Sequence, residues 1–125
     1  MSDFFEETLI ATDYLAYPTT VMTTTGYLYL LKDSKYPDAI KIGFSRDLEK
    51  RLRAYNADRP MKTCRYVFIS KAFVDVLTVE KKILNYVYDN QKSPTTFTKE
   101  WFLVEEEAYL LHLIKTAEKE FTLVT

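Results

Sequence analysis

The stretch that decides the fold is GYLYLLKDSKYPDAIKIGFSRDLEKRLRAY, which runs from Gly26 to Tyr55. It contains two runs rich in aromatic and aliphatic residues, Gly26–Leu31 and Ala39–Phe44, separated by a short polar turn. This pattern predicts two strands paired as a hairpin. Ser45-Arg46-Asp47 then predicts the start of a helix, because apolar residues recur after it at helical spacing among Lys and Arg. The expected order is strand, strand, basic helix.

The period of two along a strand assigns the hairpin side chains to two faces. One face is apolar and is expected to point into the core; it carries Leu28, Leu30, Ile40, Ile42 and Phe44. The other face combines phenol and ammonium groups with a bare glycine backbone; it carries Tyr27, Tyr29, Lys41 and Gly43. The pattern predicts that this second face forms a polar surface patch on a rigid scaffold.

The remaining elements follow in the same way. Tyr66–Ser70 predicts a third strand, central in the sheet because it is apolar on both faces. Val74–Asp89 predicts a second long helix, Glu100–Val104 a short strand, and the acids Glu105–Glu107 the start of a last helix. The expected fold class is therefore α+β, with a small sheet of three to four strands, mixed or antiparallel, flanked by helices.

Size and composition limit the organisation of the chain. Its 125 residues allow one domain, with 47% hydrophobic and 28% charged residues. We assign residues 26–125 to this domain and residues 1–25 to an acidic, threonine-rich extension of net charge −4. Within the extension, Phe4–Ile10 predicts one or two helical turns, and Pro18–Thr25 an edge strand or a linker.

Several classes of protein are excluded by the same composition. No apolar run approaches the roughly 18 residues of a membrane helix, and the acidic start does not resemble a signal peptide, so we expect an intracellular, cytoplasmic protein. Cys64 and His112 are single representatives of their types, which excludes a disulfide framework and a zinc finger. We expect Cys64 to be a small buried residue and His112 to lie at the surface.

Charge is segregated along the chain. The net charge of the whole chain is −1, but residues 41–65 alone carry a net charge of +5. Such a segment either contacts phosphate groups or forms an ordinary solvated face. The candidates for nucleic-acid contacts are Arg46, Lys50, Arg53, Arg59 and Lys62.

Glu80 is the strongest sign of a site in the sequence. It lies in the middle of an apolar helical stripe, with Val76 and Leu77 before it and Ile83 and Leu84 after it. Burying an unpaired carboxylate costs several kcal/mol. The pattern therefore demands a partner, which can be a cation, a metal ion or a proton.

Four segments together resemble the GIY-YIG nuclease superfamily: Gly26–Tyr29, Lys41–Leu52, Glu80 and Glu100–Phe102. They are most similar to its small stand-alone branch, which is common in bacteriophages and large DNA viruses. The resemblance extends from about Gly26 to Ala117. It implies an endonuclease that cleaves phosphodiester bonds with one divalent metal ion, with nucleic acid, most simply DNA, as the partner.

The resemblance also implies roles for individual residues. Glu80 takes the place of the family's metal ligand, and an oxygen ligand suits Mg2+ or Mn2+. Arg51 takes the place of the arginine that stabilises charge on the phosphate. Tyr29 takes the place of the first motif's tyrosine, which acts as a general base or positions water; as a base it needs a pKa lowered by cations such as Lys41. Arg46 assists.

The chain departs from the family at three positions. Lys41 replaces the second motif's tyrosine, as in the phage-type branch, and Tyr55 and Leu84 stand where many members carry histidine. Three hypotheses follow. The first is a metal-dependent endonuclease, and the second is a nucleic-acid-binding module without catalysis, in which Glu80 is salt-bridged to Arg51. The third is a protein-interaction domain on the same fold.

Overall fold

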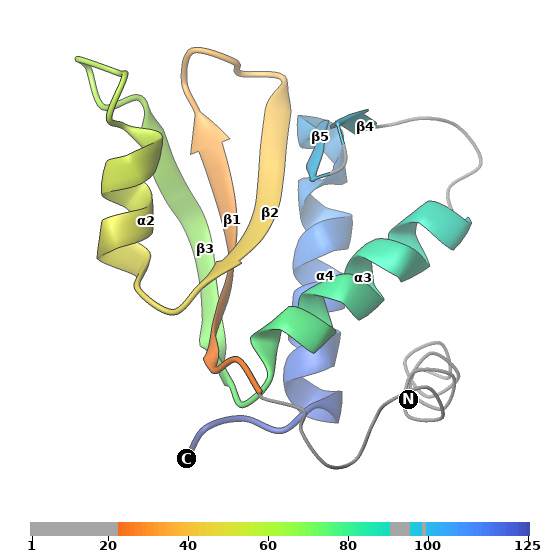
Figure 1. Cartoon of the computed structure of the whole chain (residues 1–125). Coiled ribbons are helices and arrows are strands. Elements are labelled where there is room, and N and C mark those ends of the chain that lie inside the picture. The colour runs from red at the N-terminus through yellow and green to blue at the C-terminus, as the bar shows by residue number, and fades with distance from the viewer. Residues whose placement is uncertain (1–22, 91–95, 99) are drawn as a thin grey trace.

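The predicted hairpin forms the centre of the sheet in the computed structural model, which describes residues 23–90, 96–98 and 100–125 (Figure 1). β1 (Gly26–Asp33) pairs antiparallel with β2 (Ala39–Ser45), so that Leu28 lies opposite Phe44 and Leu30 lies opposite Ile42. The hairpin and the apolar face predicted for it are confirmed. That face contributes Leu28, Leu30, Ile40 and Ile42 to the main core.

The sheet has the strand order β3-β1-β2-β5-β4, and every pairing in it is antiparallel. The edge strands are β3 (Cys64–Phe73) and β4 (Thr96–Thr98), and β5 (Trp101–Leu103) lies between β2 and β4. The predicted α+β class, with a small sheet flanked by helices, is confirmed. The central position predicted for the third strand is wrong, because β3 lies at the end of the strand order beside β1, with only an isolated bridge from Phe73 to Leu123 in addition among the described residues. Its residues are apolar on both sides because Val67 and Phe68 pack on the main core while Tyr66 packs on the opposite face.

Helices cover both faces of the sheet (Figure 1). The helical elements are α2 (Leu48–Tyr55), α3 (Val76–Asn90), the short 3-10 helix η1 (Val104–Glu106) and α4 (Glu107–Glu120). α2 begins where the sequence predicts, since the Asp47 carboxylate accepts a hydrogen bond from the backbone N–H of Lys50 at 3.1 Å. The face opposite α2 packs on α3 and α4 through Val79, Ile83, Leu110 and Ile114.

Other sequence predictions have mixed outcomes. Cys64 is buried and His112 is exposed, as expected. The helical turns predicted for Phe4–Ile10 and most of the Pro18–Thr25 segment lie outside the described residues. Within the described part of the chain, no helix has both the length and the apolar character needed to cross a bilayer.

Candidate active site

Tyr29 is buried beneath α2, and only 1% of it is exposed. The helix that follows β2 folds back over this face, where Leu48, Leu52 and Tyr55 pack against Tyr29. The polar surface patch predicted for this face is therefore wrong at its central residue. The two-residue strand period assigned the face correctly, but it carries no information on what covers that face.

The Tyr29 ring is held on three sides. Its hydroxyl shares a hydrogen bond of 2.6 Å with the hydroxyl of Tyr55, and its ring centroid lies 4.8 Å from that of Tyr66. On the third side it covers Gly43, where an added Cβ would lie 2.5 Å from the Tyr29 hydroxyl oxygen. Glycine is required at this position because any side chain would displace the phenol.

The pKa of Tyr29 moves in the direction opposite to that required of a general base. Burial raises it well above its ordinary value, the hydrogen bond with Tyr55 raises it further, and the nearby charge of Arg51 lowers it only in part. The pKa of the neighbouring Tyr66 is also raised by burial, to about 12. The Tyr29 phenol thus keeps its proton at neutral pH and can hold a neighbouring group in place.

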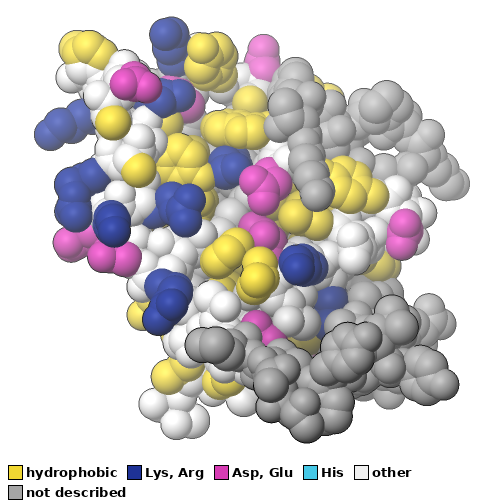
Figure 2. Space-filling model, viewed as in Figure 1, with side chains coloured by type: hydrophobic (Ala, Val, Ile, Leu, Met, Phe, Trp, Pro, Cys, Tyr) yellow, Lys and Arg dark blue, Asp and Glu magenta, His cyan; other side chains and the backbone are white. Residues whose placement is uncertain are grey.

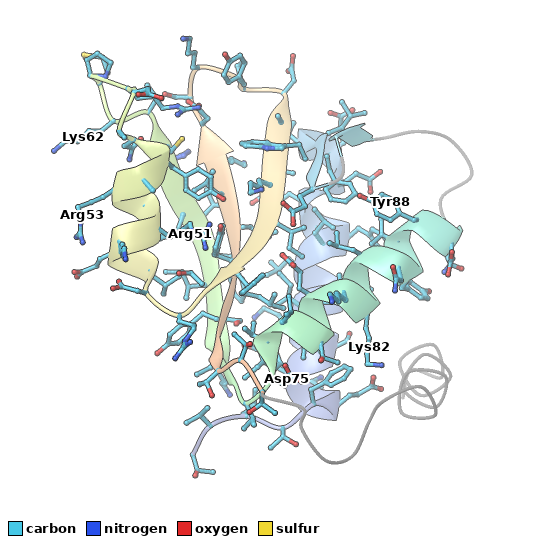
Figure 3. All side chains as sticks on the ribbon, viewed as in Figure 1. Arg51, Arg53, Lys62, Asp75, Lys82 and Tyr88 are labelled. Atoms are coloured by element: carbon cyan, nitrogen blue, oxygen red, sulfur yellow. The ribbon has the colours of Figure 1, made fainter. Side chains whose placement is uncertain are left out.

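Arg51 is exposed and lies at the junction of α2 with the rest of the site. Figure 3 shows it extending from the side of α2 that faces β2 and α3, whereas Arg53 and Lys62 extend to the outside. Its charge opposes the upward pKa shifts of Tyr29 and Glu80, so the guanidinium acts electrostatically on a phenol from β1 and on a carboxylate from α3. The three predicted site residues are thus coupled by charge.

Lys41 is fixed by a partner far along the chain. Its Nζ donates a hydrogen bond of 2.9 Å to Glu100 Oε1 and lies 5.8 Å from the centroid of the Trp101 ring. The Lys41 side chain is 13% exposed, and that of Glu100 is 38% exposed. The charges of both residues act on the pKa of Glu80, so this ion pair belongs to the same site.

Glu80 is 4% exposed, and its Oε2 has no hydrogen-bond partner among the described residues. Burial raises its pKa to about 7, helped by the negative charge of Glu100, while Lys41 and Arg51 lower it in part. The described residues contain no ion pair between Glu80 and Arg51. The salt bridge expected for a non-catalytic module is therefore not found among the described residues. In the metal-free protein the carboxyl group instead holds a proton more tightly than usual, and its Oε2 is left without a described partner.

The site fits a divalent cation bound through one carboxylate. In the described part of the chain, no three His, Cys, Asp or Glu residues cluster as a closed metal cage. Mg2+ is commonly held by one or two carboxylates, with water and substrate phosphate as its other ligands. The unpartnered Oε2 of Glu80 meets this requirement.

The raised pKa of Glu80 predicts that the metal-free protein loses stability as pH rises. Because the folded protein holds this proton with a pKa of about 7 against 4.5 for the unfolded chain, the stabilisation is complete below pH 4.5 and is lost as pH rises through 7. Glu80→Gln is expected to exceed the wild type in free energy of unfolding by about 3 kcal/mol at pH 8 and to match it below about pH 4. Urea titrations in EDTA measure this difference; Glu105→Gln, which alters an exposed carboxylate, should show none. Equal pH profiles for the wild type and Glu80→Gln would contradict the assignment.

Four of the five predicted nucleic-acid contacts are exposed: Arg46, Lys50, Arg53 and Lys62. On the face of the molecule drawn in Figure 2, Lys and Arg side chains gather over α2, and acidic side chains lie in the middle of the face. The basic cluster thus borders the acidic side chains in the middle of this face.

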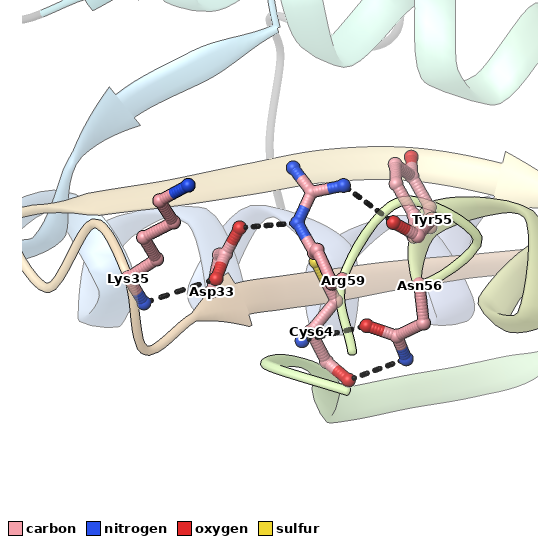
Figure 4. A network of polar contacts seen from close by, with 6 residues as sticks. All are labelled: Asp33, Lys35, Tyr55, Asn56, Arg59 and Cys64. Atoms are coloured by element: carbon pink, nitrogen blue, oxygen red, sulfur yellow. Dashed lines mark hydrogen bonds and ion pairs between the residues drawn. The ribbon is translucent and has the colours of Figure 1, made fainter. Parts of the chain in front are cut away.

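Arg59, the fifth predicted contact, is held in an internal network (Figure 4). Its Nε donates to Asp33 Oδ2 at 2.9 Å, and its Nη1 donates to the backbone carbonyl of Tyr55. The Asp33 side chain is fully buried. Arg59 therefore ties the loop after α2 to the end of β1, a structural role that the charge count did not reveal.

The Asp33 network predicts a specific acid sensitivity. Burial raises the pKa of Asp33, but polar contacts that include hydrogen bonds from the backbone N–H of Lys35 and from Arg59 Nε outweigh it and lower the pKa to about 2. Its contribution to stability is thus complete above about pH 4 and is lost as pH falls toward 2. Asp33→Asn is expected to lower the Tm at pH 7 by on the order of 5 °C. Thermal melts from pH 7 to pH 2 should show the gap closing below pH 4; a constant gap would argue against the network.

Three residues of the site were not among the predicted ones: Glu100, Tyr55 and Tyr66. Tyr55 carried a signal, because it lies one helical turn after Arg51 and so on a neighbouring part of α2. For Glu100 the sequence signal was weaker, namely its position as the acid directly before Trp101. Nothing in the sequence indicates that Tyr66 packs on Tyr29, since that contact depends on how β3 pairs with β1.

Comparison with known proteins gives one match. The family model described as the T5orf172 domain matches residues 26–117, which is most of the chain. Neither the curated proteins nor the solved structures contain a match. The matched segment includes every element from β1 to most of α4, and so every residue of the site described above.

Proposed function

The chain belongs to the T5orf172 domain family, a GIY-YIG-like domain family, and on this premise we propose that it is a metal-dependent endonuclease acting on nucleic-acid phosphodiester bonds. The observation that carries the proposal is Glu80: a carboxylate that is 4% exposed, has an unpartnered oxygen and lies within the fields of Lys41 and Arg51. A fold alone does not require such a costly group, whereas a site that binds a cation and a phosphate does.

Glu80 and Arg51 both contribute to binding the scissile phosphate, Glu80 through a metal ion and Arg51 directly. Glu80 holds Mg2+ or Mn2+, which when bound supplies positive charge to the phosphate and the leaving oxygen. Arg51 forms no ion pair with a described carboxylate, so its planar fork is available to two phosphate oxygens. Both interactions strengthen as charge develops on the phosphate in the transition state.

Tyr29 serves this site as a positioning residue. At 1% exposure and with a raised pKa, it neither reaches a substrate nor takes a proton at neutral pH. Its hydroxyl instead fixes that of Tyr55, at 2.6 Å, and Tyr55 is only partly buried. Tyr55 is thus the phenol that can contact water or a phosphate oxygen, while Lys41 holds Glu100 beside the metal-binding carboxylate.

The exposed basic residues guide the substrate to this centre. Arg46, Lys50, Arg53 and Lys62 supply charges along α2 and its flanking loops. These contacts recognise the phosphate backbone without reading sequence. Binding is therefore expected to weaken steeply as salt concentration increases.

The test is cleavage of plasmid and single-stranded DNA by the purified full chain in Mg2+ or Mn2+. The proposal expects products in either metal and none in EDTA. Absence of products in both metals, at protein concentrations that saturate DNA binding, would overturn it.

Binding without cleavage is the second candidate function. One observation favours it, namely that the pKa of Tyr29 is raised, which removes the base expected from the first family motif. The same assays separate the candidates, because a binding module gives salt-sensitive DNA affinity and no products. A domain that contacts only other proteins binds no DNA even at low salt.

A further inference from the structure

A cavity lies beside Trp101, a residue that also contacts Lys41 of the proposed active site. It has a volume of about 440 Å³ and lies between the β1–β2 turn and β5, which is a size typical of small-molecule sites. The residues that define its character are Asp33, Lys35, Tyr36, Asp38, Arg59 and Trp101. None of these has a role in the chemistry described above.

Aromatic rings and a rigid polar pair line this cavity. Tyr36 is 54% exposed, and Lys35 Nζ lies 5.9 Å from the centroid of its ring. Arg59 uses Nε and Nη1 in its contacts with Asp33 and Tyr55, and its Nη2 has no hydrogen bond to a described residue (Figure 4). Because two acids and two bases line the cavity, its charge is balanced, and it suits a flat neutral group better than a phosphate.

Trp101 is shared between the cavity and the proposed active site, because it lines the cavity and also contacts Lys41. The ring that lines the cavity lies 5.8 Å from Lys41 Nζ, and Lys41 is paired with Glu100 beside Glu80. A strand that binds at the proposed active site and passes Trp101 would therefore bring one of its nucleotides to the cavity.

We propose that this cavity binds an unpaired nucleobase of the substrate strand, stacked on Tyr36 and Trp101 and hydrogen-bonded to Arg59. The inference rests on the proposed function, because it places the same strand in the catalytic site. Every base has a flat π face, and stacking on aromatic side chains is the usual means of holding unpaired bases. A base paired within a duplex cannot enter, so the cavity selects strands with unpaired nucleotides.

Trp101 reports on the cavity directly, because it is the single tryptophan of the chain. The experiment titrates the full chain, in EDTA to prevent cleavage, with a single-stranded DNA octamer and with an abasic octamer of the same backbone. We expect the octamer to quench Trp101 fluorescence and to bind about tenfold more tightly than the abasic strand. Tyr36→Ala is expected to remove most of this difference, and Tyr36→Phe, which keeps the ring, to retain it.

Equal quenching and equal affinity for the two octamers would overturn the inference, as would an unchanged preference in Tyr36→Ala. Tyr36→Ala should fold normally, because the turn is held by backbone bonds from Tyr36 N–H to Asp33 and from Ala39 N–H to Tyr36, and a thermal melt verifies this. The cleavage assay is independent: cleavage without base preference refutes only the cavity, whereas base preference without cleavage refutes only the nuclease.

Discussion

Glu80→Gln is expected to lower the rate of metal-dependent DNA cleavage at least about 10³-fold, because the amide cannot hold the cation that neutralises the scissile phosphate. The change keeps the shape of the side chain within the α3 stripe, where Glu80 is 4% exposed. Rates are measured on plasmid DNA with Mg2+ and with Mn2+ at saturating protein concentration. The matched control is Glu105→Gln, which removes an exposed carboxylate before α4 and should retain full activity.

Loss of activity in Glu80→Gln can be separated from loss of folding. The substitution removes a buried charge whose pKa is raised to about 7, so the variant is expected to be more stable than the wild type at pH 8. An inactive protein with a raised denaturation midpoint thus supports a metal site at Glu80. Retention of more than a tenth of the wild-type rate would exclude Glu80 as the essential ligand.

Arg51→Lys is expected to lower cleavage about 10²-fold, with the loss mainly in kcat. Lysine keeps the positive charge but loses the planar fork that can bind two phosphate oxygens at once. Removing one preorganised donor to a developing oxyanion typically costs 10² to 10³ in kcat. Since the ground-state attraction to DNA depends largely on charge, KM should change little.

Arg53→Lys is the matched control for Arg51→Lys. It lies on the same helix two residues later, and its side chain extends to the outside (Figure 3). It is expected to cleave at the wild-type rate and to bind DNA with nearly unchanged salt dependence. Equal effects of the two substitutions would mean that α2 contributes only a diffuse positive field and no group specific to the transition state.

The sequence predicted the local elements well because they depend on short-range patterns. The alternation along Leu28–Leu30 and Ile40–Ile42 identified the hairpin and the face that enters the core. Asp47 identified the start of α2, and the apolar stripe around Glu80 identified the buried carboxylate. Each of these conclusions needs only residues within a few positions of one another.

Long-range partners were the part that sequence patterns could not supply. Lys41 was predicted as a cation in the field of Tyr29, but its partner Glu100 lies 59 positions away. Arg59 was predicted to contact phosphate. Its actual partner, Asp33, lies 26 positions earlier, and no local pattern reveals that pairing. Tyr29 appeared solvent-facing because the strand period does not show that α2 covers it. In each case the missing information is which element packs against which.

The proposed site is divided between α2 and α3, which pack on opposite faces of the sheet. This division has a consequence for how the protein loses activity on heating. α2 is eight residues long and has no fully buried residue, whereas α3 places Val79, Ile83 and Val87 in the main core. Such a lightly anchored segment opens at a lower free-energy cost than the body of a domain. Fraying of α2 would carry the guanidinium away from the carboxylate while the sheet stayed intact, so thermal inactivation should precede the loss of secondary structure.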